Sequence, residues 1–168
     1  MDQNKVENAR ISWNEVFIKI LETLSMRSTC SKLQTAAIIV RDKNIISSGY
    51  NGTACGDIEC STYWRKYHEK NNISVSFNEW IKTSAFRDLH RDWSTENEIH
   101  AELNTLRWIS KNEIDKCELY TLYSPCKICA KEIIAYGVKT IYYKFLYKND
   151  IHPIKKLEEN NIKCIQII

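Results

Sequence analysis

The stretch LYTLYSPCKICAKEIIAYGVKTIYY, from Leu119 to Tyr143, sets the expected architecture of this chain. Its apolar runs predict a strand over residues 119–123 and a second strand over 138–143. Between them, residues 126–136 have the pattern of a helix, and Gly137 stands where a helix C-cap is expected. The stretch therefore predicts a strand–helix–strand unit, which is the building block of a layered α/β sheet.

The sequence on either side continues this alternation of strands and helices. Ser12 is the expected cap of a first helix, because apolar residues follow it at helical spacing. The further expected elements are two hairpin strands over 36–40 and 45–50, a helix over 99–109, a helix over 154–159 and a last strand over 162–168. This order predicts an α/β fold in which helices lie on the faces of the sheet.

One long segment, residues 61–97, does not fit the alternation. It is polar with scattered aromatic residues and shows no clean period. We expect an irregular insert that carries one or two short helices. Because the chain has no internal repeat and no linker-like stretch, residues 1–168 are predicted to form a single domain with this insert.

The composition excludes several classes of protein. The chain has 168 residues with only four Gly and two Pro, which is untypical of collagen-like or low-complexity sequences. Its seven Cys are too sparse for a disulfide-stapled miniprotein. Residues 1–8 are polar and no apolar run is long enough for a membrane span, so we expect a cytoplasmic protein whose cysteines are thiols or metal ligands. The net charge of +3 permits an anionic substrate and predicts no stable nucleic-acid partner.

Two short motifs at expected helix starts indicate a metal site. The first is His100-Ala101-Glu102, and the second contains Cys126 and Cys129, which share a helix face. His100 and the two cysteines make three ligands and leave one position of a zinc tetrahedron open, as in catalytic zinc sites. Glu102 would move protons beside the metal. The H-x-E…P-C-x-x-C pattern resembles the signature of zinc-dependent nucleobase deaminases.

Other interpretations of these motifs explain fewer of the residues. A single C-x-x-C is often a redox pair or half of a zinc ribbon, but a ribbon needs a second C-x-x-C, which the sequence lacks. A redox pair has no need of His-x-Glu. A non-catalytic zinc module for protein contacts would need neither Glu102 nor an open metal position.

Three segments outside the zinc motifs resemble one family, the deoxycytidylate (dCMP) deaminases of the phage type. These segments are 27–30 (RSTC), 49–53 (GYNGT) and 90–104 (HRDWSTENEIHAELN). The resemblance extends from Trp13 to the final strand. It implies a three-layer α-β-α cytidine deaminase fold, with a five-stranded mixed sheet and helices on both faces.

The same resemblance implies an activity and its regulation. Members of the family hydrolyse dCMP to dUMP and ammonia and so supply dUMP for thymidylate synthesis. They are commonly homohexamers, and many are activated by dCTP and inhibited by dTTP with Mg²⁺. The resemblance also suggests a viral source and therefore a host cytoplasm as the location.

The resemblance further assigns roles to particular residues. A second, structural zinc would be held by Cys30, Cys60, His90 and Glu98. Alternatively, Cys30 is a buried thiol and His90 a surface residue of the insert. The expected substrate contacts are Lys32, Asn51, Ala101, Ser124 and Tyr147. The expected allosteric residues are Tyr50, Asn51, Gly52, Trp108 and Lys111.

Two related activities remain open from the sequence. A deaminase acting on cytosine or adenine in single-stranded DNA or tRNA would share the zinc core, and the aromatic residues of the insert come with Arg65, Lys66 and Lys70. A bifunctional enzyme that deaminates both dCMP and dCTP is the second alternative.

Overall fold

The computed structural model describes residues 10–167 of the chain. The polar segment Met1–Asn8 and Ile168, the end of the predicted last strand, lie outside these residues. Among the helices between residues 10 and 167, none combines the length and the apolar character that a membrane crossing requires.

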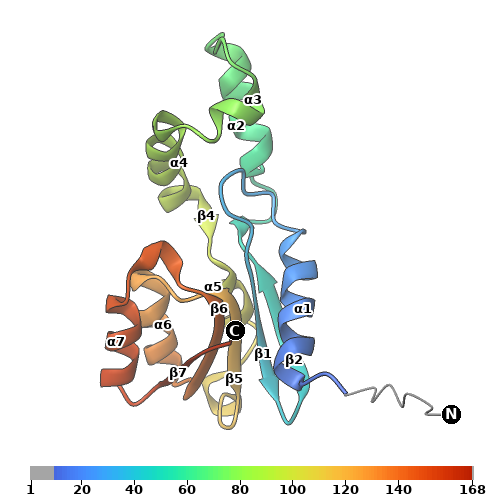
Figure 1. Cartoon of the computed structure of the whole chain (residues 1–168), viewed down its shortest axis with the longest axis vertical. Coiled ribbons are helices and arrows are strands. Elements are labelled where there is room, and N and C mark those ends of the chain that lie inside the picture. The colour runs from blue at the N-terminus through green and yellow to red at the C-terminus, as the bar shows by residue number, and fades with distance from the viewer. Residues whose placement is uncertain (1–9, 168) are drawn as a thin grey trace, which may run out of the picture.

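A five-stranded mixed sheet forms the centre of the molecule (Figure 1). Its strand order is β2-β1-β5-β6-β7. Strand β1 pairs antiparallel with β2 and with β5, whereas β6 pairs parallel with β5 and with β7. The strands are β1 (Ala36–Arg41), β2 (Asn44–Tyr50), β5 (Glu118–Tyr123), β6 (Thr140–Phe145) and β7 (Lys163–Gln166). The predicted mixed sheet is confirmed.

Helices cover both faces of this sheet. Helix α1 (Trp13–Ser25) packs on one face, while α5 (Ala101–Leu106), α6 (Lys127–Tyr136) and α7 (His152–Glu159) pack on the other. Strand β1 is buried on both sides, because its successive side chains alternate between two faces that are both covered by helices. Ile38 belongs to the core under α1, and its neighbour Ile39 belongs to the core under the other three helices. The three-layer α/β prediction is therefore confirmed.

Local sequence signals explain where the helices begin and end. Ser12 caps α1, and its hydroxyl and backbone N–H exchange hydrogen bonds with Glu15 in a capping box. Gly137 ends α6 with φ of 91°, a left-handed conformation that glycine adopts at low cost. Asp42 and Lys43, with φ of 49° and 65°, make the tight turn between β1 and β2.

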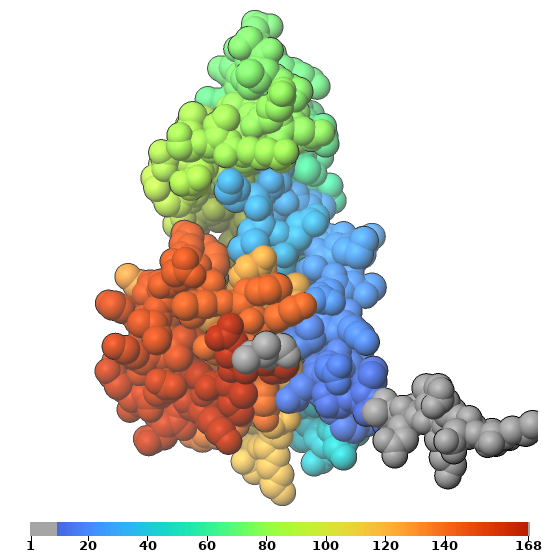
Figure 2. Space-filling view, in the orientation of Figure 1, coloured from blue at the N-terminus to red at the C-terminus, as the bar shows by residue number. Residues whose placement is uncertain are grey.

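The insert is more regular than the sequence predicts. It consists of α2 (Cys60–Lys70), α3 (Phe77–Trp80) and α4 (Ser84–Asn97), which stand together above the sheet (Figures 1 and 2). Trp64, Trp80 and Phe86 are buried in a core of their own, separate from the two cores of the sheet. The expectation of an irregular insert with one or two short helices is wrong, because the segment forms three helices whose aromatic side chains share one core.

A short ribbon joins both ends of the insert to the sheet. Strand β3 (Gly52–Thr53) precedes the insert and β4 (Glu98–Ile99) follows it, and the two pair antiparallel. The insert is thus closed at its base by backbone hydrogen bonds. This pairing also fixes Glu98 at the junction between the insert and the sheet.

Two further expectations differ from the structure. The helix predicted over 99–109 is shorter, because α5 ends at Leu106. Trp108 therefore follows the helix, and Lys111 opens a 3₁₀ turn, η1 (Lys111–Glu113). The strand predicted over 138–143 is observed two residues later, over 140–145.

Candidate functional site

His100, Cys126 and Cys129 meet where two helices of one layer begin. His100 is the N-cap of α5 and Cys126 is the N-cap of α6. His100 Nδ1 lies 3.2 Å from Cys129 Sγ and 3.4 Å from Cys126 Sγ. The structure thus brings together all three residues that the motifs predicted as ligands.

The donor set of this cluster fits a zinc ion. Zn–S bonds of about 2.3 Å and Zn–N bonds of about 2.0 Å in a tetrahedron place N and S roughly 3.5 Å apart, close to the observed separations. The hydrogen bond from Cys129, assisted by His100, lowers the pKa of Cys126 to about 3. The hydrogen bond with Cys126 raises the pKa of His100 to about 9. Thiolate is therefore favoured at a position where a cation would bind.

Glu102 lies beside this cluster on the first turn of α5. It is 6% exposed, although it carries a carboxyl group. Burial raises its pKa above the ordinary value, and the charge of His100 opposes this shift. A buried carboxyl group with a raised pKa can both accept and return a proton, which is the role predicted for Glu102.

The position of α5 depends on close contacts with β2. The Ser47 hydroxyl donates to Thr105 O at 2.6 Å, and Asn104 Nδ2 donates to Tyr50 O at 2.8 Å. Gly49 allows the two backbones to touch, since a Cβ at this position would lie 2.7 Å from Thr105 N. The glycine is required here for a close approach rather than for a turn. These contacts set where His100 and Glu102 lie relative to the sheet.

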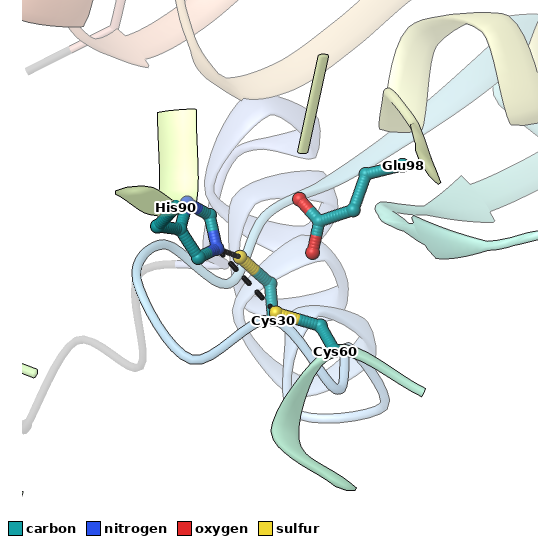
Figure 3. A group of neighbouring side chains, drawn as sticks. All are labelled: Cys30, Cys60, His90 and Glu98. Atoms are coloured by element: carbon teal, nitrogen blue, oxygen red, sulfur yellow. Dashed lines mark hydrogen bonds between the residues drawn. The ribbon is translucent and has the colours of Figure 1, made fainter. Parts of the chain in front are cut away.

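A second cluster joins Cys30, Cys60, His90 and Glu98 (Figure 3). The four residues come from the loop after α1, from α2, from α4 and from β4. His90 Nε2 lies 3.4 Å from the sulfur atoms of both Cys30 and Cys60. All four ligand atoms lie within 4.8 Å of one another, as the second zinc prediction requires.

The charges of the second cluster also fit a bound cation. Hydrogen bonding from Cys60 lowers the pKa of Cys30 to about 4. Burial raises the pKa of Glu98 to about 7. Glu98 Oε1 is buried and has no hydrogen-bond partner among residues 10–167. An unpartnered buried carboxylate oxygen is costly, and a metal ion at this point would satisfy it.

The predicted substrate contacts come from several parts of the fold. Asn51 is buried, and its amide accepts a hydrogen bond from Thr35 N and donates one to Leu33 O, so it fixes the loop before β1. The Ser124 hydroxyl accepts a hydrogen bond from Tyr147 N, which couples the end of β5 to the 3₁₀ turn η2 (Tyr147–Asn149). Their contacts with a substrate stay a prediction.

Ala101 and Lys32 occupy very different surroundings. Ala101 is fully buried at the start of α5, next to His100. Lys32 is exposed on the loop after α1, and its Nζ donates to Ile81 O in the insert at 3.4 Å. The sequence indicated Arg65 only as part of a possible nucleic-acid contact and did not indicate Ser31, although both line the same cavity as Lys32. Neither belongs to a catalytic or metal-binding motif that would mark it as a site residue.

The predicted allosteric residues are divided between two parts of the fold. Tyr50, Asn51 and Gly52 lie at the end of β2 and in β3. Trp108 is 70% exposed and lines a shallow cavity with residues 45–48 of β2 instead. Lys111 is exposed on η1.

Comparison with known proteins agrees with this arrangement. Residues 11–145 match the family described as the cytidine and deoxycytidylate deaminase zinc-binding region. The deoxycytidylate deaminase of Enterobacteria phage T2 is 33% identical over 143 residues, which cover 75% of this chain and 76% of that protein. ComE operon protein 2 of Bacillus subtilis is 32% identical over 160 residues, covering 94% of this chain and 72% of that protein.

A solved structure is similar over almost the whole chain. It is the crystal structure of dCMP deaminase from the cyanophage S-TIM5 in complex with dCMP and dUMP. The two structures superpose with a TM-score of 0.65 and 27% sequence identity, covering 91% of this chain and 95% of that chain.

Proposed function

Because this chain belongs to the cytidine and deoxycytidylate deaminase family, we propose that it hydrolyses dCMP to dUMP and ammonia. The observation that carries the proposal is the meeting of His100, Cys126 and Cys129 beside the buried Glu102. The similarity to the phage T2 deoxycytidylate deaminase and to the cyanophage dCMP deaminase supports dCMP as the substrate. The product dUMP would supply thymidylate synthesis.

In this proposal His100, Cys126 and Cys129 hold one zinc ion. When bound, the zinc supplies a hydrolytic nucleophile at neutral pH by lowering the pKa of water to about 7. The contacts between α5 and β2 set the position of His100 relative to the sheet. Three protein ligands would leave the fourth position to water and substrate.

Glu102 moves the protons of the reaction. It takes a proton from the attacking water, passes it to the ring nitrogen, and later delivers a proton to the departing ammonia. One water adds to the carbon that bears the exocyclic amine, the carbon–nitrogen bond breaks, and the ring keeps the oxygen. Burial raises the pKa of Glu102 above its ordinary value, which favours a carboxyl group that can hold a proton before passing it on.

The remaining substrate contacts are assigned to residues from several parts of the fold. We assign the sugar hydroxyl to Asn51, the pyrimidine carbonyl to the backbone N–H of Ala101, and the 5′-phosphate to Lys32. The Ser124 hydroxyl accepts a hydrogen bond from the backbone N–H of Tyr147, which supports a role for both residues at the edge of the substrate site.

A second zinc ion, held by Cys30, Cys60, His90 and Glu98, completes the proposed cofactors. Its role is structural, because its four ligands join the insert to the loop after α1 and to β4 (Figure 3). The unpartnered Glu98 Oε1 is the observation that supports it.

Regulation and assembly belong to the same proposal. We assign activation by dCTP and inhibition by dTTP, with Mg²⁺ accompanying the nucleotide, to Tyr50, Asn51 and Gly52. Trp108 and Lys111 are assigned to effector binding or to subunit contacts of a homohexamer. An exposed Trp108 beside the exposed Ile45 and Ile46 on edge strand β2 supports a subunit contact.

A substrate panel tests the proposed activity. Zinc-loaded protein is incubated with dCMP, dCTP, deoxycytidine and a cytosine-containing single-stranded oligonucleotide, with and without dCTP, dTTP and Mg²⁺. We expect ammonia release from dCMP at a rate well above that from deoxycytidine or the oligonucleotide. Turnover of the oligonucleotide alone would favour a nucleic-acid deaminase. No turnover with both metal sites filled would favour a non-catalytic zinc module.

A further inference from the structure

A cavity of about 650 Å³ lies between the loop after α1 and the insert. One wall is formed by residues 28–34, and the other by α2 and by residues of α3 and its C-terminal end. Tyr123, at the end of β5, also lines it. Ligand pockets of small molecules commonly have volumes of about 300–1,000 Å³, so this cavity is large enough for a nucleotide.

The lining of the cavity carries positive charge without acidic residues. Lys32 and Arg65 contribute the two cations, and none of the lining residues is Asp or Glu. The Arg65 guanidinium stacks on the Phe77 ring at 4.4 Å from its centroid. Neither cation belongs to an ion pair within residues 10–167. Stacking orients the guanidinium plane and leaves its N–H groups free for an anion.

One residue of the lining, Ser31, carries a buried hydroxyl without a hydrogen-bond partner among residues 10–167. Ser28, Thr29, Ser61 and Asn78, which all have polar side chains, line the same space. A ligand with several acceptor oxygens would satisfy these donors, and a phosphate group presents such oxygens.

The second cluster builds this wall in advance. Ser31 N donates to Cys60 Sγ at 3.3 Å, and Lys32 N and Leu33 N donate to Cys30 Sγ at 3.5 Å. The loop is therefore wrapped around the two sulfur atoms, which fixes Ser31 and Lys32 opposite α2. The backbone of Lys32, one of the two cations of the cavity, is therefore held by a hydrogen bond to the second cluster.

We propose that Arg65 of the insert, together with Ser31, adds to the phosphate contact assigned to Lys32, so that this cavity binds the phosphate of a nucleotide with Arg65 as its main cation. That the phosphate belongs to a nucleotide rests on the proposed function. The phosphate belongs either to the substrate nucleotide or to a separate regulatory nucleotide. Two lining residues connect the cavity to the candidate substrate site. Tyr123 directly precedes Ser124, and Leu33 O accepts a hydrogen bond from the side-chain amide of Asn51.

The test measures binding rather than turnover. Dissociation constants for dUMP, deoxyuridine and dTTP are determined by calorimetry on the zinc-loaded full chain, since none of these compounds carries the amine that the enzyme would remove. The variants are Arg65→Gln, Arg65→Lys and the control Arg87→Gln, which changes an exposed arginine of α4 outside the cavity. Circular dichroism checks that each variant is folded.

The two sources of phosphate give different results. If the substrate phosphate binds here, Arg65→Gln weakens dUMP binding about tenfold or more, leaves deoxyuridine unchanged, and Arg65→Lys recovers part of the loss. If a regulatory nucleotide binds here, Arg65→Gln weakens the binding of dTTP and leaves the dissociation constant of dUMP unchanged. Weakening of both nucleotides with unchanged deoxyuridine also supports a phosphate contact.

Other results would overturn the phosphate site. One is that Arg65→Gln binds both nucleotides as tightly as the wild type. The others are that Arg65→Gln loses as much affinity for deoxyuridine as for the nucleotides, or that Arg87→Gln loses as much nucleotide affinity as Arg65→Gln. Failure of the proposed function is separate, because wild-type protein that binds dUMP through Arg65 but releases no ammonia from dCMP would contradict the activity alone.

Discussion

His100 Nδ1 lies 3.2 Å from Cys129 Sγ, although 29 positions separate the two residues in the chain. The contact joins the start of α5 to the first turn of α6, and Cys126 lies on the same side at 3.4 Å from the imidazole. This relationship joins two separate helix starts into one candidate metal centre, on which the first prediction depends.

We expect Cys129→Ser to empty the catalytic zinc site. Replacement of the thiolate removes a direct ligand, and even partners that only orient a ligand are worth about 10–100-fold in affinity. Metal analysis should find one zinc per chain fewer than in the wild type, together with loss of ammonia release from dCMP. Cys55→Ser, which changes an exposed free thiol, is the control and should keep all of its zinc. Full zinc content in Cys129→Ser would contradict the assignment.

Glu102→Gln should separate metal binding from catalysis. The amide keeps the size of the buried side chain but cannot carry the proton, so kcat should fall by about 10²–10⁴-fold. Zinc content should stay at the wild-type level, because Glu102 is not a ligand. The exposed Glu132→Gln on α6 is the control for the same chemical change. Wild-type turnover in Glu102→Gln with zinc bound would refute the proton role.

The second cluster predicts a stability effect centred on the insert. Cys60→Ser should remove one zinc per chain and expose the insert to limited proteolysis, since the ligands of this cluster hold the insert to the loop after α1. Cleavage within residues 61–97, followed by mass spectrometry, is the measurement. Cys164→Ser, a half-buried thiol in β7, should keep the wild-type cleavage pattern. An unchanged zinc content in Cys60→Ser would rule out the second metal.

Gly49→Ala should destabilise the protein through α5. The added Cβ would lie 2.7 Å from Thr105 N and 2.9 Å from Ala101 O, and both are backbone atoms that cannot move without shifting the helix. Overpacking of this kind costs about 1–3 kcal/mol, which denaturant unfolding can measure. Gly52→Ala is the control, since its nearest neighbour would be Thr29 Oγ1 at 3.9 Å. Equal stability of the two variants would show that the close approach is not required.

Trp108→Lys should weaken self-association. Trp108 lies beside the exposed Ile45 and Ile46 of edge strand β2, and an exposed apolar patch of this kind commonly marks a protein contact. Light scattering after size-exclusion chromatography should give a smaller mass for the variant than for the wild type. Met26→Lys, at an exposed apolar residue after α1, should not change the mass. The same mass for Trp108→Lys and the wild type would exclude this surface as a subunit contact.

Elements that depend on nearby residues were predictable from the sequence. The capping box of Ser12 and Glu15, the hairpin of β1 and β2, and the C-cap at Gly137 all rest on interactions within a few residues. The lengths of α5 and of the insert helices were not predictable in this way. Their boundaries depend on what they pack against, as when Trp64 and Phe86 from different helices share one core.

The sequence by itself indicated the residues of the candidate metal centre, because the spacing of Cys126 and Cys129 puts both on one helix face and His100 belongs to the same known signature. It also determined the strand–helix–strand frame from Leu119 to Tyr143. Only the tertiary structure decided how distant segments meet. It brought His90 of α4 to the two cysteines of the second cluster, set Gly49 against Thr105, and placed Arg65 and Lys32 on one cavity. Such contacts arise from packing between elements, and no local pattern encodes them.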